Sequence, residues 1–173
     1  MTFAVERLAE WHLTAADEAA IADLLSRCFA TDFGGRSFFT HHHHLRLVIR
    51  GDGLIGHMAL VLRSILLDGR QISVAGLAEV ATDPAHRGQG IGATLLRTAI
   101  AEAKASPAEF LLLFGVARLY AAAGFRPVAN PLVQTGVDGK QVVTAGDAAL
   151  MVLPLRGQIW PDTALVDLRG PVF

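Results

Sequence analysis

Hydrophobic and polar positions follow two periods along the chain, one typical of helices and one typical of strands. Three helices are predicted, over residues 14–29, 90–105 and 118–123. Thr14 opens the first with a pattern close to a capping box, T-A-A-D, ahead of apolar residues at helical spacing. Ser106-Pro107 ends the second, and Gly124 supplies the left-handed residue that commonly closes a helix such as the third.

Most of the remaining chain has the character of β-strands. The predicted strands are residues 3–7, 45–50, 54–67, 70–82, 109–115, 125–133 and 150–155, with a polar hairpin around residues 136–146. Asp68-Gly69 is a two-residue hairpin signal, so residues 45–82 are expected to form an antiparallel meander of three strands. The order of strands, helix, strand, helix and strands indicates an α/β fold with a mixed sheet, in one domain over residues 1–173.

Composition narrows the class of protein. The 173 residues are 52% hydrophobic and 18% charged, as expected for a globular chain with a large core rather than a disordered one. A net charge of -1 gives no overall basic field for nucleic acid or an anionic membrane surface. The longest strongly apolar run, residues 110–117, is shorter than the roughly 20 residues that cross a bilayer. The first residues do not resemble a signal peptide, so a cytoplasmic location is expected.

Cysteine and histidine usage argues against a metal centre. Cys28 is the only cysteine, which excludes a disulfide framework or thiolate cluster, and its helical setting predicts a buried, inert thiol. Residues 41–44 are four consecutive histidines, but on a strand they would alternate between faces. No second cluster completes a zinc site, so a polar strand entrance or the rim of a substrate cleft is predicted, and no metal.

The segment with the strongest chemical signal is residues 79–93. A strand ends there, a loop follows, and Gly88, Gly90 and Gly92 open a helix. Glycine lets a backbone approach a ligand closely, and the first N–H groups of a helix bind phosphate, so this segment is predicted to hold an anion. It lacks the Gly-Lys-Ser/Thr of a P-loop and the G-x-G-x-x-G spacing of a dinucleotide site, which disfavours ATP and NAD.

Two motifs resemble those of one enzyme family. The run R-G-Q-G-I-G at residues 87–92 resembles the R/Q-x-x-G-x-G/A pyrophosphate loop of the GNAT superfamily of acyl-CoA-dependent N-acyltransferases. The run L-Y-A-A-A-G-F at residues 119–125 resembles the L-Y-x-x-x-G-F helix of that family, at the family's usual separation. The resemblance covers about residues 4–155. It implies the GNAT fold, a mainly antiparallel sheet that splays between its fourth and fifth strands and is flanked by helices.

The resemblance also implies a co-substrate, acetyl-CoA, and the residues that bind it. Backbone groups of the strand end would bind the pantetheine arm and polarise the thioester carbonyl, and those of the glycine loop would hold the pyrophosphate. These residues are Val80, Ala81, Thr82, Arg87, Gly88, Gln89, Gly90, Ile91, Gly92 and Ala93. Tyr120 would protonate the departing thiolate as general acid; the alternative for Tyr120 is an aromatic core residue.

Glu79 is the candidate general base. Acyl transfer needs a neutral amine, whereas a free amine is mostly charged at pH 7, so a base must take its proton. Glu79 lies in the apolar run V-A-G-L-A-E-V-A-T, where a carboxylate is costly unless it faces a wet cleft or a cationic partner. The alternative is a solvated strand residue.

A closer resemblance suggests the acceptor. Residues 54–84, 29–33, 150–154 and the tail D-L-R-G-P-V-F resemble aminoglycoside 2'-N-acetyltransferases. In that group a cationic aminosugar is bound by acids and a terminal carboxylate at positions matching Asp32, Glu79, Asp147 and Phe173. The chain departs from the group at Leu77, where an aromatic residue is expected, in its final Phe instead of Trp, and in a shorter segment after Phe114. The acceptor and the acyl length therefore stay open.

These patterns together predict an enzyme. It would be an N-acetyltransferase that moves an acetyl group from acetyl-CoA to a primary amine of a small cationic acceptor, with an aminosugar as one candidate. The alternatives are a non-catalytic acyl-CoA-binding module, an N-acyltransferase for a longer acyl thioester, and a decarboxylase or hydrolase of CoA thioesters. The expected partners are a small-molecule amine and, as an open possibility, a second copy of the chain in a homodimer.

Overall fold

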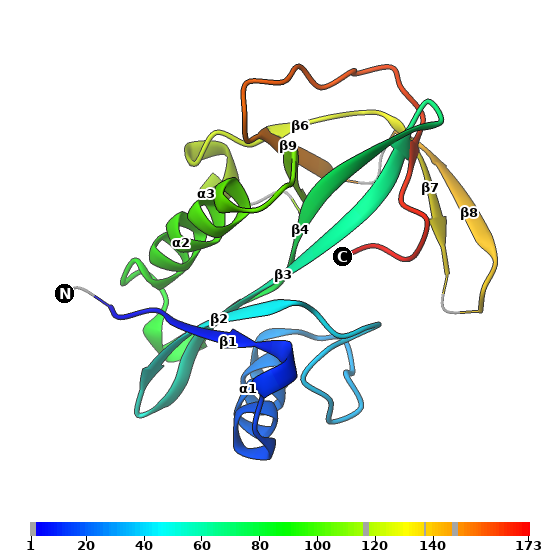
Figure 1. Ribbon diagram of the computed structural model, residues 1–173. Coiled ribbons are helices and arrows are strands. Elements are labelled where there is room, and N and C mark those ends of the chain that lie inside the picture. The colour runs from blue at the N-terminus through cyan, green and yellow to red at the C-terminus, as the bar shows by residue number, and fades with distance from the viewer. Residues whose placement is uncertain (1–2, 116–117, 137, 147–148) are drawn as a thin grey trace. The chain divides into compact units, whose positions relative to one another are not determined.

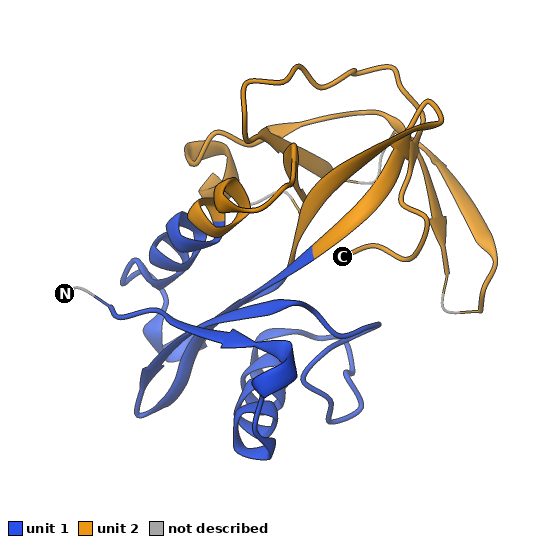
Figure 2. Ribbon diagram, in the orientation of Figure 1, with its two compact units in different colours: residues 1–61, 78–99 blue, residues 62–77, 100–173 orange. Residues whose placement is uncertain are grey.

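The computed structural model describes residues 3–115, 118–136, 138–146 and 149–173 (Figure 1). The chain divides into two compact units, Met1–Val61 with Ala78–Ala99 and Leu62–Leu77 with Ile100–Phe173 (Figure 2). The strands β3 and β4 and the helix α2 pass from one unit into the other. None of the helices in the described ranges is both long and apolar enough to span a membrane.

The first unit contains four strand segments that precede the helix α2 in the sequence. Its elements are β1 Glu6–Ala9, a 3₁₀ turn Glu10–His12, α1 Ala15–Cys28, β2 Leu45–Gly51, the first part of β3 Gly53–Leu67, the end of β4 Arg70–Thr82, a 3₁₀ turn Pro84–His86 and most of α2 Ile91–Ala105. Strand β2 pairs antiparallel with both β1 and β3.

Capping and close packing fix the two helices of this unit. Thr14 accepts a hydrogen bond from the N–H of Asp17 at 3.1 Å, and the Asp17 carboxylate accepts the N–H of Thr14 at 3.2 Å, which confirms the predicted capping box. At Gly56 of β3 an added Cβ would lie 2.6 Å from Cγ2 of Ile91. The glycine therefore lets the first turn of α2 pack directly on the strand.

The second unit contains most of the strands. Its elements are the remainder of β3, β4 and α2, followed by β5 Phe110–Phe114, α3 Arg118–Ala122, β6 Arg126–Pro127, β7 Pro131–Thr135, β8 Gln141–Ala145, β9 Leu150–Pro154 and β10 Val166–Asp167. The strand order is β6-β9-β5-β4-β3-β10-β7-β8. The β4–β5 and β7–β10 pairs are parallel and the β5–β9 and β7–β8 pairs antiparallel, so the predicted mixed sheet is confirmed.

A buried polar residue ties the C-terminal segment to the core of this unit. The Trp160 ring meets Phe110 edge-on, with ring centroids 5.0 Å apart, and its indole N–H donates to Asn130 at 2.7 Å. The Asn130 amide in turn donates to the carbonyls of Pro161 and Ala164, both at 2.8 Å. The indole N–H of Trp160 and the amide group of Asn130 have thus found partners in place of water.

Several elements match their predicted positions, and two predicted strands were wrong in detail. Asp68 and Gly69 have φ of +47° and +78°, as the predicted two-residue turn requires. The single strand expected over residues 125–133 is two strands, because Pro127 and Pro131 cannot donate a ladder hydrogen bond. The first strand is Glu6–Ala9 rather than residues 3–7, and β10 was not predicted. The histidines at residues 41–44 lie in an irregular segment directly before β2, which matches the predicted polar strand entrance.

Candidate functional site

The end of β4 has an unusual backbone. Its ladder with β5 runs from Val74 to Leu77, and the strand then continues to Thr82 beyond that ladder. Glu79 has φ +49°, in the left-handed region that residues with a Cβ rarely adopt. Such a conformation costs about 1–3 kcal/mol and persists only where surrounding contacts hold it.

The loop that follows β4 is fixed at its first residue. The N–H of Asp83 donates to the carbonyl of Ile55 at 3.0 Å, and the Asp83 carboxylate accepts the N–H of Ala85 at 2.8 Å. Arg27 of α1 donates to the same carboxylate. The start of the predicted phosphate loop is thereby anchored to β3 and α1.

The glycines of this loop serve its backbone conformation. Gly88 and Gly90 have φ of +77° and +83°, and a Cβ at either position would meet no atom within 4 Å. Their role is therefore the left-handed turn and an unobstructed surface, not close packing. The carbonyl of Gly90 accepts the N–H of Thr94 at 3.0 Å, which leaves the N–H groups of Ile91 to Ala93 at the open end of α2. This geometry suits an anion such as a phosphate.

The single cysteine lies beside the same loop. Cys28 is half-buried, and its thiol donates to the carbonyl of Thr82 at 3.4 Å. Burial raises the pKa of this thiol, although the positive charges of Arg87 and Arg27 oppose the effect. A thiol that retains its proton is a poor nucleophile, which agrees with the predicted inert role.

The Glu79 carboxylate lies in a hydrogen-bonded pocket of the first unit. Oε1 accepts the backbone N–H of Phe39 at 2.8 Å, and Oε2 accepts from Nη1 of Arg46 at 3.0 Å. Nε2 of His43 lies 3.7 Å from Oε1. The side chain of Glu79 is only 9% exposed, so the cationic partner that its apolar strand demanded is Arg46.

Arg46 binds several groups around Glu79, and it was not among the site residues predicted from the sequence. Its side chain is fully buried and donates to Glu10 through Nε at 2.7 Å and through Nη2 at 2.9 Å. Nη1 also donates to the carbonyl of Ser37 at 2.8 Å. The signal was present in the run L-R-L-V-I-R, where a charged residue interrupts an apolar strand.

Burial shifts the pKa values of this cluster strongly. It raises the pKa of Glu79 to about 7, even though the N–H of Phe39 and the charge of Arg46 lower it. It lowers the pKa of His43 to about 2 and that of His57 to about 3, with Arg46 as the next cause. Near pH 7 both histidines are therefore neutral and Glu79 can exchange a proton.

Tyr120 lies in α3 of the second unit. Its ring is buried, meets Phe125 edge-on with centroids 6.0 Å apart, and would lie 3.4 Å from a Cβ at Gly115. Burial raises the pKa of the phenol, so the hydroxyl keeps its proton at neutral pH. That is the protonation state a general acid needs.

The residues predicted to bind the acceptor are distributed over both units. Asp32 is exposed in the first unit, where its carboxylate accepts the N–H of Gly34 at 2.7 Å. The Phe173 ring lies in the second unit against Gly76, where any Cβ would collide with it, and under the Arg63 guanidinium, 4.7 Å from the ring centroid. Asp147 lies outside the described residues.

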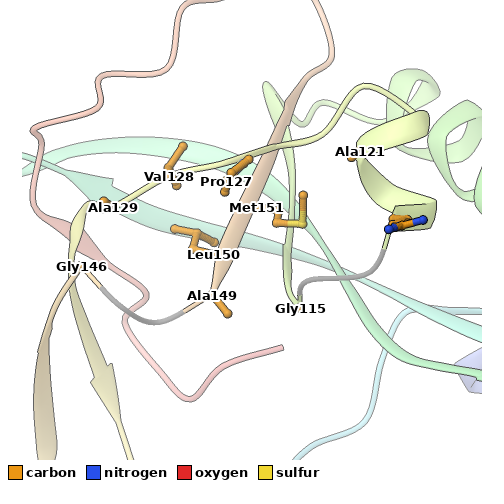
Figure 3. A pocket seen from close by; sticks show the side chains of 10 residues that line it. Gly115, Ala121, Pro127, Val128, Ala129, Gly146, Ala149, Leu150 and Met151 are labelled. Carbon is orange, nitrogen blue, oxygen red and sulfur yellow. The ribbon is translucent and has the colours of Figure 1, made fainter.

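Each unit also contains a cavity. The larger, of about 700 Å³, is apolar and lies in the second unit (Figure 3). It is lined by Gly115, Arg118, Ala121, Pro127, Val128, Ala129, Gly146, Ala149, Leu150 and Met151. The smaller, of about 550 Å³, lies in the first unit between α1 and residues 35–42, next to the Ser37 carbonyl that Arg46 binds. Within the described ranges, no group of three or more His, Cys, Asp or Glu residues could hold a metal ion.

Solved structures of several acetyltransferases have a fold similar to that of this chain. The chain is similar to the Escherichia coli GNAT family N-acetyltransferase YhbS, solved with CoA, at 21% identity and TM-score 0.65 over 97% of this chain and 91% of that one. It is similar to a Brucella melitensis GNAT acetyltransferase, solved with acetyl-CoA, at 22% identity and TM-score 0.60 over 95% and 96%. The Escherichia coli ribosomal-protein-S18-alanine N-acetyltransferase matches at 20% identity and TM-score 0.58 over 91% and 100%.

At these identities the structural likeness establishes the fold, and the family assignment comes from sequence. A search of curated proteins finds no significant match. A family model described as an acetyltransferase (GNAT) domain matches residues 12–128, which is more than half of the chain and includes both the glycine loop and the Tyr120 helix. The chain belongs to the GNAT family of acetyltransferases.

Proposed function

We propose that the protein transfers an acetyl group from acetyl-CoA to the primary amine of a small cationic acceptor, with an aminosugar as the specific candidate. The observation that carries the proposal is Glu79, a buried carboxyl with a pKa of about 7. It lies four residues before the loop that leads into α2. A base whose pKa is near the working pH is the most effective one for removing a proton from an ammonium group.

The open N-terminus of α2 supports the acetyl-CoA part of the proposal. Gly88 and Gly90 leave the loop surface unobstructed, and the first N–H groups of α2 are directed at its open end. In the proposed complex these groups bind the pyrophosphate, Arg87 adds a charge at the rim, and Val80 to Thr82 bind the pantetheine arm.

The proposed reaction needs no covalent enzyme intermediate. Glu79 takes a proton from the bound ammonium, and the freed nitrogen lone pair attacks the thioester carbonyl carbon. The tetrahedral intermediate then expels the CoA thiolate as the C–S bond breaks, and Tyr120 donates its phenolic proton to the sulfur. The amine nitrogen loses its second proton to solvent, Glu79 releases the proton it took, and Tyr120 regains one from solvent, which leaves an amide, free CoA and the enzyme in its starting state.

The cationic acceptor is the finer part of the proposal. It rests on the resemblance to aminoglycoside 2'-N-acetyltransferases inferred from sequence motifs, and the exposed carboxylate of Asp32 supports it. Asp32 belongs to the same irregular segment that donates the Phe39 N–H to Glu79. In the proposed complex, Asp147 and the carboxylate of Phe173 also bind the acceptor.

One observation favours a longer acyl group as a second candidate. The larger cavity is apolar, and its wall includes Gly115, which also borders the Tyr120 ring. Apolar walls favour an aliphatic chain over a charged sugar. Under this alternative, the thioester carries an acyl chain of several carbons and the acceptor binds elsewhere.

A paired screen tests both candidates. Purified protein is incubated with acetyl-CoA or hexanoyl-CoA and with cationic, neutral or anionic amines, and release of free thiol is followed. The proposal expects acetyl transfer to cationic amines, with Glu79→Gln slowed by about 10²–10⁴-fold and Asp52→Asn, in the exposed β2–β3 turn, fully active. Faster transfer from hexanoyl-CoA favours the second candidate. CoA binding without turnover of any amine contradicts both and favours a binding module.

A further inference from the structure

A buried histidine holds the strained peptide at Glu79. The carbonyl oxygen of Glu79 lies 2.8 Å from Nδ1 of His57, on the neighbouring strand β3. A carbonyl oxygen only accepts hydrogen bonds, so Nδ1 must carry the proton. Because Glu79 has φ +49°, this bond is one of the contacts that keep an unfavourable conformation in place.

The other ring nitrogen of His57 confirms the same tautomer. Nε2 lies 3.4 Å from Nη1 of Arg46, and a guanidinium only donates, so Nε2 must be the acceptor. The ring is fully buried, and burial together with Arg46 lowers its pKa far below neutrality. His57 is therefore a neutral bridge with one defined donor, aimed at the Glu79 carbonyl.

The planar peptide passes this orientation to the next residue. Among the described residues no peptide bond is cis, so the carbonyl of Glu79 and the N–H of Val80 leave one plane in opposite directions. With the carbonyl fixed toward His57, the Val80 N–H is fixed away from it. Val80 is among the groups that the proposed function places on the pantetheine arm, which ends in the thioester of acetyl-CoA.

We propose that His57 is a positioning residue for acyl transfer. Its Nδ1–H holds the Glu79–Val80 peptide so that the Val80 N–H donates to the thioester oxygen as negative charge develops there. Donors that are aligned before the reaction stabilise such charge because they need not reorganise during it. The His57 proton stays on Nδ1 throughout, and no bond to the ring forms or breaks. The inference rests on the proposed use of acetyl-CoA, but not on the identity of the acceptor.

Two substitutions at His57 distinguish the effect of its Nδ1–H donor from the effect of the volume that its ring fills. His57→Asn keeps an N–H donor at the same number of bonds from Cα as Nδ1, whereas His57→Leu fills a similar volume without a donor. We expect kcat in the Leu variant to fall by about 10²–10³-fold, the usual effect of losing one oxyanion donor. The Asn variant is expected to retain most of the activity, and the Kd for CoA to change by no more than about twofold in either.

A second readout does not depend on finding the acceptor. The infrared carbonyl stretch of acetyl-CoA, labelled with ¹³C at the thioester carbon, is measured bound to wild type and to each variant. A shift to lower frequency in wild type and the Asn variant, and a smaller one in the Leu variant, supports the proposal. Equal shifts in all three overturn it, as does an equal loss of kcat in both variants. If the Leu variant does not fold, ¹⁵N spectra of the wild-type imidazole decide, since a proton on Nε2 of His57 overturns the proposal.

Failure of the proposed function can be distinguished from failure of the role proposed for His57. Wild type that shows the carbonyl shift but acetylates no amine contradicts the proposed acyl transfer, while it supports the aligned Val80 donor. Wild type that does not bind acetyl-CoA overturns both.

Discussion

The strongest quantitative prediction concerns the acid limb of the pH profile of kcat/KM. Glu79 accepts a proton only when ionised, and its pKa is about 7, so the ionised fraction falls about tenfold for each pH unit below 6. We therefore expect kcat/KM to rise between pH 5 and pH 8 with a midpoint near 7. Glu79→Gln should lower kcat/KM by about 10²–10⁴-fold, the usual contribution of a general base, and should remove this midpoint.

The groups that face Glu79 determine whether the midpoint belongs to it. Arg46, with its partner Glu10, and the ring of His43 lie beside the carboxylate, and the ring of His57 binds the backbone carbonyl of Glu79. Both histidines have pKa values of about 2 to 3, so neither titrates between pH 5 and pH 8. Any limb that survives in the Gln variant therefore comes from the amine or from another group. A wild-type profile that is flat from pH 5 to pH 8 would refute the assignment of Glu79 as base.

The same pKa shift predicts an effect on stability. The pKa of Glu79 is about 7 in the folded protein against an ordinary value of 4.5, so the folded state binds this proton more tightly than the unfolded chain. The associated stability is fully present below pH 4.5 and is lost as pH rises to about 7. At about 1.4 kcal/mol per pKa unit, the loss is about 3 kcal/mol.

Urea denaturation at pH 5 and pH 8 measures this loss without any substrate. The difference in free energy of unfolding between wild type and Glu79→Gln isolates the titration of this one group, because all others are shared. We expect wild type to lose about 2.5 kcal/mol relative to the Gln variant between the two pH values, because part of the stability is already lost at pH 5. An unchanged difference would mean that Arg46 keeps Glu79 ionised throughout, and the kinetic argument would fail with it.

Three further substitutions test the glycine loop, the general acid Tyr120 and the hydrogen bonds that Asn130 makes in the second unit. Gly90→Val places a β-branched residue at φ +83° and should weaken CoA binding at least about tenfold by calorimetry, while Gly157→Val, at φ +78° in the second unit, should not. Tyr120→Phe removes the phenolic proton and should lower kcat by about 10²-fold with unchanged Kd for CoA; an unchanged kcat would assign proton donation to water. Asn130→Ala leaves the indole N–H of Trp160 and two buried carbonyls unpaired and should cost about 2–4 kcal/mol in urea denaturation, whereas a loss below about 0.5 kcal/mol would show that water replaces the amide.

Local signals in the sequence were sufficient for most elements of the fold. The capping box at Thr14, the Asp68-Gly69 turn and the glycines before α2 each act within a few residues, so a pattern read along the chain can detect them. The two-residue strand β10 has no such signal, because it exists only through its pairing with β3 and β7. The single strand expected at residues 125–133 failed for a local reason that was visible, since prolines stand at positions 127 and 131.

The candidate site was predictable in part. The energetic argument that singled out Glu79 also demanded a cationic partner, but it could not name one, because Arg46 lies 33 residues away. Residues that contact each other only through neighbouring strands leave no spacing in the sequence to recognise. The same argument, applied to every polar residue in an apolar run, identifies Arg46 in β2 and His57 in β3 as well.

Arg46, His57 and Glu79 bind one another because their strands are adjacent, and this is why each can be buried. A buried guanidinium, a buried carboxylate and a buried imidazole would each be costly alone, and together they satisfy most of the hydrogen bonds that burial removes from water. Arg46 alone would make Glu79 a fixed anion, and burial alone would keep it protonated. With both effects present, the pKa lies near 7, and the carboxyl can exchange a proton where an amine needs to lose one.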